Sequence, residues 1–395
     1  MIRYFTSGES HGQGLVGIVE GVPAGLEISA AYINEQLRRR QQGYGRGGRM
    51  KIETDTVEIL SGVRFGKTIG SPIALLVRNR DWANWTEKMS VEPIDADVEK
   101  ITVPRPGHAD MSGKFKYGFD DIRNVIDRAS ARETAMRVAC CTIARRMLDT
   151  FGIHIGSHVL SIGGAGLKHR KNIDVRIGTL IRSVNGAYRI AEEADRSEVR
   201  MLDATTEGRA IAAIKACKKK GDTLGGIFEV LVTGVPMGLG TYVQFDRKLD
   251  AQLAEAVMSI QAVKGVEIGD AFENARRVGS EVHDEIMLSR KKEILRPTNG
   301  AGGMEGGMSN GEPIVLRGAM KPISTLAHPL RSVDLKTNKA VVSRYERSDV
   351  CAVPACAVIA EAVIAPVLAN AMLEKFGGDS IGEVAKRFRS GKKIQ

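Results

Sequence analysis

The segment at residues 350–373 is the most apolar part of the chain, and it restricts the folds that the sequence can adopt. It is rich in alanine but is interrupted by Glu361, Pro354 and Pro366. A membrane-spanning helix would hardly tolerate a carboxylate and two prolines in so alanine-rich a segment. The segment is therefore predicted to be a buried helix. The N-terminal residues, MIRYFTSGESHGQG, lack the apolar core of a secretory signal, so the sequence predicts a cytoplasmic protein.

The remaining periodic segments alternate between strand and helix patterns. Alternating apolar residues predict strands at residues 15–20, 73–77, 225–235 and 314–320. Helical spacing predicts helices at residues 132–150, 195–221 and 248–263. The spacing of these elements is irregular, which favours an α+β fold over a doubly wound parallel sheet. No repeat or linker divides the chain, so residues 1–395 are interpreted as a single domain.

Composition narrows the classes of ligand. The chain has 57 Lys and Arg residues against 47 Asp and Glu residues, a formal charge of +10, which favours anionic partners. Its 44 glycines indicate many tight turns and close backbone approaches. Aromatic residues are only 5%, so base stacking on exposed rings is disfavoured. The five cysteines form no CxxC pair and no zinc-like spacing, which predicts reduced, packed thiols and no metal site.

A central stretch at residues 102–139 carries the first candidate site. His108 lies in a Pro-Gly turn, and the run Arg128, Ala129 and Ser130 opens an alanine-rich helical pattern. Helix N-termini bind anions through free backbone N–H groups. Histidine can exchange protons near neutral pH. The stretch therefore predicts a site for a phosphorylated ligand with proton-transfer chemistry beside it.

Two segments near the N-terminus have both a structural and a functional interpretation. His11 lies in the glycine turn SGESHGQG, where it is equally well explained as an exposed loop residue or as a ligand contact. Residues 38–49, RRRQQGYGRGGR, look like an RGG-type RNA-binding arm. The arm occurs once, however, and a strand-like pattern follows it. A loop that binds a small anion is therefore favoured over an RNA-binding tract.

Three further features lie in the C-terminal third. The glycine-rich residues 297–312 have neither a Walker lysine nor a GxGxxG after a strand, so P-loop and dinucleotide-fold interpretations are weak. Residues 321–325, KPIST, place one ammonium and two hydroxyls at the end of a strand, where they can bind a phosphate or ring carbonyls. Asp349 stands directly before the apolar segment, and its position alone favours a helix N-cap over a functional carboxylate.

Together these motifs resemble the chorismate synthase family, in order and over nearly the whole chain. The matching segments are SGESHG at 7–12, GYGRGGRMKIETD at 43–55, RPGHAD at 105–110, RASARETA at 128–135, GGMEGGMSNG at 302–311, KPIST at 321–325 and RSD at 347–349. The resemblance implies an anti 1,4-elimination of phosphate from 5-enolpyruvylshikimate 3-phosphate, which gives chorismate in the shikimate pathway. It also implies reduced FMN as an electron donor without net redox change, a β–α–β sandwich of antiparallel sheets around a helical core, and a homotetramer.

The resemblance also assigns roles to residues. His11 is implied as the general acid for the leaving phosphate, His108 as a group that stabilises or protonates the reduced flavin, and Asp349 as a residue facing the flavin N5. This role for Asp349 replaces the N-cap interpretation. The implied FMN contacts are Arg128, Ala129, Ser130, Gln261, Ala262, Gly306, Lys321, Pro322, Ile323, Ser324, Thr325 and Arg347. Arg40 and Arg46 match positions for nicotinamide phosphate or substrate, and Arg49 is expected near the anionic groups of the substrate.

Some alternatives stay open at this point. The sequence does not decide whether the chain reduces its own flavin with NADPH or depends on an external flavin reductase. A flavin-dependent reductase is disfavoured because no nicotinamide-binding fold is recognisable. An RNA-binding protein is disfavoured because it has no need for the two histidine motifs. The partners expected are therefore small phosphorylated molecules, with neither nucleic acid nor a membrane.

Overall fold

The N-terminal part of the chain forms a four-stranded antiparallel sheet. The computed structural model gives the fold and describes residues 1–48, 53–166, 177–181, 183, 185–346 and 348–392. The strand order is β1 (Arg3–Ser7), β2 (Gly14–Glu20), β6 (Ile73–Arg78) and β3 (Val57–Ile59). In β2 the side chains of Leu15 and Val19 are buried while Val16 and Ile18 are exposed, the period of two expected for a sheet with one covered face.

A second antiparallel sheet has five strands. Their order is β10 (Val263–Ile268), β15 (Ile314–Met320), β9 (Gly226–Thr233), β7 (His154–Ile162) and β8 (Ala165–Gly166). Two-stranded hairpins join β4 (Val63–Arg64) to β5 (Lys67–Thr68), β11 (Met287–Leu288) to β12 (Ile294–Leu295), β13 (Met304–Glu305) to β14 (Met308–Ser309) and β16 (Arg331–Asp334) to β17 (Lys339–Val342).

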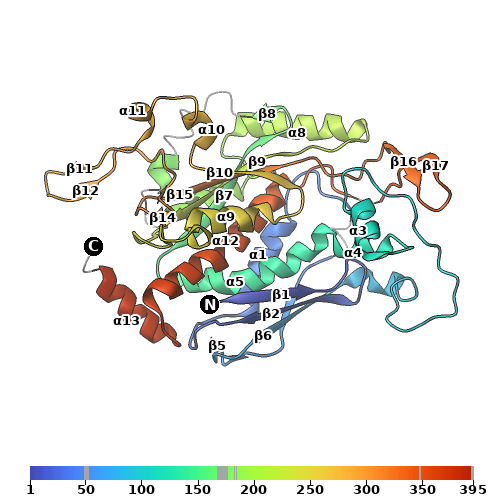
Figure 1. Cartoon of the computed structure of the whole chain (residues 1–395), viewed down its shortest axis with the longest axis horizontal. Helices are drawn as coiled ribbons and strands as arrows, with labels where there is room; N and C mark the ends of the chain where they lie inside the picture. Colours follow the sequence, from blue (N-terminus) through green and yellow to red (C-terminus); the bar gives the residue numbers. More distant parts are fainter. Residues whose placement is uncertain (49–52, 167–176, 182, 184, 347, 393–395) are drawn as a thin grey trace.

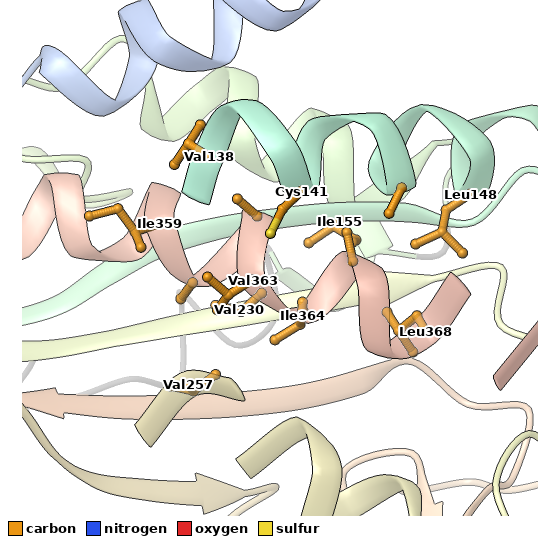
Figure 2. Packing of buried hydrophobic residues seen from close by; sticks show 14 of the residues in the cluster. Val138, Cys141, Leu148, Ile155, Val230, Val257, Ile359, Val363, Ile364 and Leu368 are labelled. Atoms are coloured by element: carbon orange, nitrogen blue, oxygen red, sulfur yellow. The ribbon is translucent and has the colours of Figure 1, made fainter. Parts of the chain in front are cut away.

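Long helices connect the two sheets into one core. α5 (Thr134–Thr150) contacts β2 and β6 of the first sheet, and α12 (Val353–Phe376) packs on β7 and β9 of the second. Both helices lie between the sheets (Figure 1), and α1 (Ala30–Gln41) packs against both of them. Figure 2 shows side chains of α5 and α12 packed together with Ile155 of β7 and Val230 of β9. The mixed content of helices and antiparallel sheets confirms the α+β prediction.

The apolar segment at 350–373 forms most of α12, which confirms the buried helix. By length and composition α12 could cross a membrane, but 83% of its most apolar window is buried inside the protein. Glu361, in the middle of the helix, has no exposed side-chain surface and lies among three arginines. Glu361, the carboxylate that argued against a membrane span, therefore forms buried ion pairs inside the core.

The other helices of the described residues are short or lie at the periphery. They are η1 (Arg80–Asn84), α3 (Asp110–Tyr117), α4 (Arg123–Arg128), η2 (Ala131–Glu133), α7 (Gly186–Ala194), α8 (Ala204–Lys219), η3 (Phe245–Arg247), α9 (Leu249–Met258), α10 (Ala271–Asn274), α11 (Gly279–Val282) and α13 (Ile381–Lys392).

All five cysteines are buried and free, as predicted. Burial raises the pKa of the Cys141 and Cys356 thiols to about 12, so these thiols are unreactive packing groups.

Two helix predictions were too long. The helix predicted at 195–221 begins only at Ala204, because the Asp203 side chain accepts a hydrogen bond from the Thr206 backbone N–H and caps it there. The helix predicted at 248–263 ends at Met258. Ala262 has a φ of +67°, and this left-handed residue turns the chain into β10.

The first sheet packs closely on α5 at Gly17 of β2, and a substitution at this position tests that packing. A Cβ at this position would lie 2.3 Å from Cys140 Sγ and 2.6 Å from Met136 Sδ. We expect Gly17→Ala to lower the free energy of unfolding by about 1–3 kcal/mol, because the extra methyl overpacks the core. Gly208→Ala is the matched control, since its Cβ would meet nothing within 4 Å on the surface of α8, and it should be neutral or slightly stabilising. Urea unfolding measures both, and equal effects would contradict this packing.

Candidate active site

The motif at 105–110 meets the motif at 321–325 directly. The Lys321 ammonium donates to the Gly107 carbonyl, and Arg105 Nη1 donates to Thr325 Oγ1 at 3.0 Å. Gly107 has a φ of +77°, a backbone conformation that favours glycine and that the Pro-Gly sequence supplies. The His108 loop and the KPIST strand end, predicted from separate segments, therefore lie side by side.

His108 is held by a buried ion pair. Its Nδ1 contacts Asp110 Oδ1, and Arg105 Nη2 lies 3.0 Å from the same nitrogen. Asp110 opens α3 with no exposed side-chain surface, and Arg105 Nε donates to its Oδ2 at 2.8 Å. Burial alone would raise the pKa of Asp110, but the hydrogen bonds from His108 and Arg105 outweigh it and hold this pKa well below its usual range. Asp110 is therefore a fixed anion beside the ring.

His11 lies in the turn between β1 and β2 and is also paired with a buried carboxylate. Its Nδ1 is 2.5 Å from Asp127 Oδ1, and the two side chains are 12% and 0% exposed. The ring stacks on Trp85 with a centroid distance of 3.8 Å and an interplanar angle of 26°. His11 is therefore an anchored, mostly buried residue rather than an exposed loop residue. Trp85 directly follows η1 (Arg80–Asn84), so this short helix places the indole on the His11 ring.

The run 128–130 fastens α4 to the first sheet. Arg128 donates to the Gly8 carbonyl at 3.1 Å and to the Thr6 carbonyl at 3.0 Å. The Ser130 Oγ accepts from the Arg132 backbone N–H and caps η2, which leads into α5. The serine-capped helix start predicted from this run is therefore present.

Glu133 joins this corner to the predicted flavin positions 261 and 262. Its carboxylate accepts from Thr6 Oγ1 at 2.8 Å and from Gln261 Nε2 at 3.1 Å. The Ala262 carbonyl accepts from the Lys321 backbone N–H at 2.9 Å. Two of the predicted flavin segments, 261–262 and 321–325, are thus adjacent, and Glu133 ties them to the strand that Arg128 holds.

Asp349 adjoins the same strand end. Its Oδ1 accepts from the Gly47 backbone N–H at 2.6 Å and its Oδ2 lies 3.2 Å from Arg46 Nε. The neighbouring Ser348 Oγ donates to the Thr325 carbonyl at 2.9 Å. α12 begins at Val353 with Ala352 as its N-cap, so the N-cap interpretation of Asp349 was wrong. The Asp349 carboxylate instead holds the loop that contains Arg46 and Gly47 close to the KPIST strand end.

Arg40 lies behind these groups. It donates to Thr134 Oγ1 at 2.8 Å and to the Ala131 carbonyl at 3.0 Å, with a side chain only 4% exposed. Burial lowers its pKa to about 10, while the nearby Asp55 opposes this shift. These contacts fix the start of α5. Two other predicted residues, Arg49 and Arg347, lie outside the described residues.

Gly306 is the predicted flavin contact that stands apart. It lies at the turn of the hairpin β13–β14 with a φ of +60°, and a Cβ built on it would meet nothing within 4 Å. No hydrogen bond among the described residues joins it to the other predicted flavin positions. Of the remaining positions, the Ile323 carbonyl accepts from Thr223 Oγ1 at 2.6 Å, which fixes the KPIST backbone from behind.

Known proteins match this chain over nearly its whole length. A sequence model of the family described as chorismate synthase matches residues 2–373. Chorismate synthases of Chlorobium phaeovibrioides and Chlorobaculum tepidum are 62% and 61% identical to the chain over 388 residues, which is 98% of this chain and 96% of each relative. The chain belongs to the chorismate synthase family. A crystal structure of chorismate synthase, 44% identical, covers 100% of this chain and 98% of its own with a TM-score of 0.78.

Membership in the chorismate synthase family confirms the resemblance drawn from the motifs. It makes the chain an enzyme, a lyase acting on phosphates, and places it in the shikimate pathway. Within this chorismate synthase fold, the sequence did not reveal the groups that orient the histidines, namely Asp127, Asp110, Arg105, Arg123 and Trp85. A signal existed for Asp110, two residues after His108. None existed for Asp127, because a contact over 116 residues follows no spacing rule.

Proposed function

We propose that the chain converts 5-enolpyruvylshikimate 3-phosphate to chorismate and phosphate with reduced FMN as cofactor. One observation supports the proposal: a series of contacts links the motifs that carry His11 and His108. Arg123 links Asp127, the partner of His11, to Glu346 just before the RSD motif, at 3.7 and 3.4 Å. Two residues further on, Ser348 bonds to Thr325, which bonds to Arg105 beside His108.

The residues present fit a bound FMN. Gln261 Oε1 is buried and has no hydrogen-bond partner among the described residues, and a ring N–H of a flavin would supply one. Lys321, Ser324 and Thr325 provide an ammonium and two hydroxyls for a phosphate or ring carbonyls. The open space beside the backbone of Gly306 suits close approach of a ligand. When bound, reduced FMN would lend an electron to the substrate and recover it, so that the reaction has no net redox change.

The side chains of the chain have separate tasks in the elimination. One C–O bond to phosphate and one ring C–H bond break, phosphate leaves with the electron pair of the C–O bond, and a new C=C bond forms. His11 donates a proton to the leaving phosphate, and His108 balances charge on the reduced cofactor. Arg46, Arg49 and Lys321 offset the carboxylates and phosphates of the ligands, and this accounts for the basic composition. Asp349, which Gly47 and Arg46 orient, would face the flavin N5 and help it take up the ring proton.

The assembly and location follow the same reasoning. We infer that the whole chain is one domain of the β–α–β sandwich type, that it forms a cytoplasmic homotetramer, and that its flavin is reduced either by NADPH on the enzyme or by an external reductase. The outer face of the first sheet supports assembly, because Phe5, Val16 and Ile18 are 65%, 39% and 46% exposed there.

The alternative of an RNA-binding arm at 38–49 is disfavoured by particular ion pairs. Arg39 pairs with Glu361 and Asp195 inside the core, at 2.7 Å each. Arg40 is buried against Thr134, and Arg46 pairs with Asp349. Arg39 and Arg40 are engaged inside the fold, and Arg46 lies against Asp349, so these three cations do not form a continuous row along which a nucleic-acid backbone could bind. Filter binding with random RNA should show no salt-dependent affinity, whereas a steep salt slope would favour the alternative.

The activity is tested by incubating the purified protein anaerobically with the enolpyruvyl substrate and chemically reduced FMN. We expect phosphate and chorismate to be released in equal amounts. Omitting flavin, or supplying oxidised FMN alone, should abolish both. Replacing the chemical reductant by NADPH then tells whether the chain reduces its own flavin. Flavin binding without any product would refute the proposed activity.

A further inference from the structure

His11 is attached to α4 at two points. The carboxylate of Asp127 meets the ring at Nδ1, 2.5 Å away. The backbone carbonyl of the same residue accepts from the Ser10 backbone N–H at 3.0 Å. Trp85 stacks on the ring at 3.8 Å. One buried residue on a helix therefore fixes both the turn and the side chain that it carries.

Asp127 differs from the other carboxylates that lie beside histidines in the described part of the chain. Asp110 receives a guanidinium N–H at 2.8 Å, Asp149 beside His154 receives a tyrosine O–H at 2.7 Å, and Glu229 beside His158 receives a guanidinium N–H at 2.7 Å. The nearest cation to Asp127, Arg123, is 3.7 Å from Oδ2, which accepts no hydrogen bond from the described residues. His11 is thus the donor on which this buried carboxylate depends.

This dependence determines which ring nitrogen carries the proton. An ionised carboxylate can only accept hydrogen bonds, and a buried one without a donor is costly. The short contact therefore requires a proton on Nδ1 of His11. At His108, by contrast, Nδ1 faces both the Asp110 acceptor and the Arg105 donor, so the carboxylate does not fix its tautomer.

We propose that Asp127 is a positioning residue that holds His11 in one orientation with a proton on Nδ1, so that the second proton, which makes the ring an imidazolium, binds at Nε2 and is the one given to the leaving phosphate. The proposal deepens the proposed function and rests on it for the role of His11. The charged groups around the pair are Arg123, which also lies 5.0 Å from the Trp85 ring, Glu346 beyond Arg123, Lys88 over Trp85 at 5.7 Å, and Glu9 in the same turn.

The tautomer is tested in the unliganded protein, without any assay of activity. Protein labelled with 15N-histidine gives imidazole nitrogen shifts that distinguish Nδ1–H from Nε2–H, and His11→Gln assigns the signal of His11. At a pH where the ring is neutral, the wild-type protein should show Nδ1–H, and Asp127→Asn should lose this preference. A wild-type ring protonated at Nε2 would overturn the proposal, even if the variant failed to fold.

The kinetic consequence is tested with reduced FMN. Asp127→Asn should lower kcat by roughly 10²-fold with KM for the substrate changed less than about threefold, because positioning rather than binding is lost. In the His11→Ala background, Asp127→Asn should lower kcat by less than about a further twofold, since both substitutions act through one ring.

Asp149→Asn, beside His154 and outside the motifs, is the control for losing such a carboxylate and should leave kcat unchanged. An additive loss in the double variant, or an equal loss in the control, would overturn the proposal. A wild-type protein without activity would refute the proposed function, while the nitrogen shifts would still decide the tautomer.

Discussion

His11→Ala is expected to lower kcat by roughly 10² to 10⁴-fold, the range for loss of a general acid. The ring is 12% exposed, is held at Nδ1 by Asp127 and stacks on Trp85, so its geometry is set before the substrate binds. Without the imidazole, phosphate must leave without a proton donor. The fold should survive, because the turn also keeps its backbone bond from Ser10 to Asp127. Single-turnover phosphate release measures the effect.

His154 provides the matched control for this prediction. Its ring is also 12% exposed and lies beside a carboxylate, Asp149, at 3.4 Å, but it stands outside the motif cluster. His154→Ala should leave kcat near the wild-type value, whereas His108→Ala should lower it in the same range as His11→Ala. Wild-type activity in purified His11→Ala, or an equal loss in His154→Ala, would remove the acid role.

Glu361→Gln is expected to lower the free energy of unfolding by about 3–5 kcal/mol, because it leaves buried guanidinium groups without their carboxylate. Glu361 Oε2 accepts from Arg39 at 2.7 Å and from Arg145 at 2.6 Å, and its Oε1 accepts from Arg200 at 3.2 Å. These arginines come from α1, α5 and the segment before α8, so the carboxylate ties the helical layer together. Urea unfolding at fixed protein concentration measures the loss.

The pH dependence of this pair has a definite sign. Burial raises the pKa of Glu361, but the three arginines outweigh it and depress this pKa well below its usual value of 4.5. A depressed pKa means that the carboxylate contributes its full stabilisation above pH 4.5 and loses it only as pH falls towards the folded value. Glu361→Gln should therefore flatten the acid limb of the stability curve. Glu374 is on the same helix as Glu361, α12, and forms an exposed ion pair with Arg247 of η3. Glu374→Gln should therefore change the free energy of unfolding by less than about 1 kcal/mol. If Glu361→Gln lowered the free energy of unfolding no more than Glu374→Gln does, the buried ion pairs of Glu361 would not stabilise the fold as expected.

The strands and the core helix were predictable because their patterns are local. Leu15 and Val19 alternate with exposed residues, and the alanine-rich segment of α12 has no polar face, so burial follows directly from the sequence. The end of α9 at Met258 was not predictable, because Ile260 continues the helical spacing and the left-handed Ala262, which turns the chain into β10, is a residue type that ordinarily favours helix.

The site was predictable only in part, for a related physical reason. The motifs identified His11, His108 and the KPIST strand end, and the fold brings them together. The contacts that give these residues their geometry join positions far apart in the chain, as Arg105 does with Thr325 and Asp127 with His11. Asp349 shows the limit most clearly, because a carboxylate before an apolar helix has the local pattern of a cap, while its partners Gly47 and Arg46 lie in another segment.

We propose that reduced FMN assists the elimination without being consumed. The most direct measurement counts chorismate formed per reduced FMN under strict anaerobiosis, with the flavin spectrum recorded before and after. We expect many molecules of chorismate per flavin and a flavin that is still reduced at the end. One chorismate for each flavin oxidised, or turnover without flavin, would contradict it.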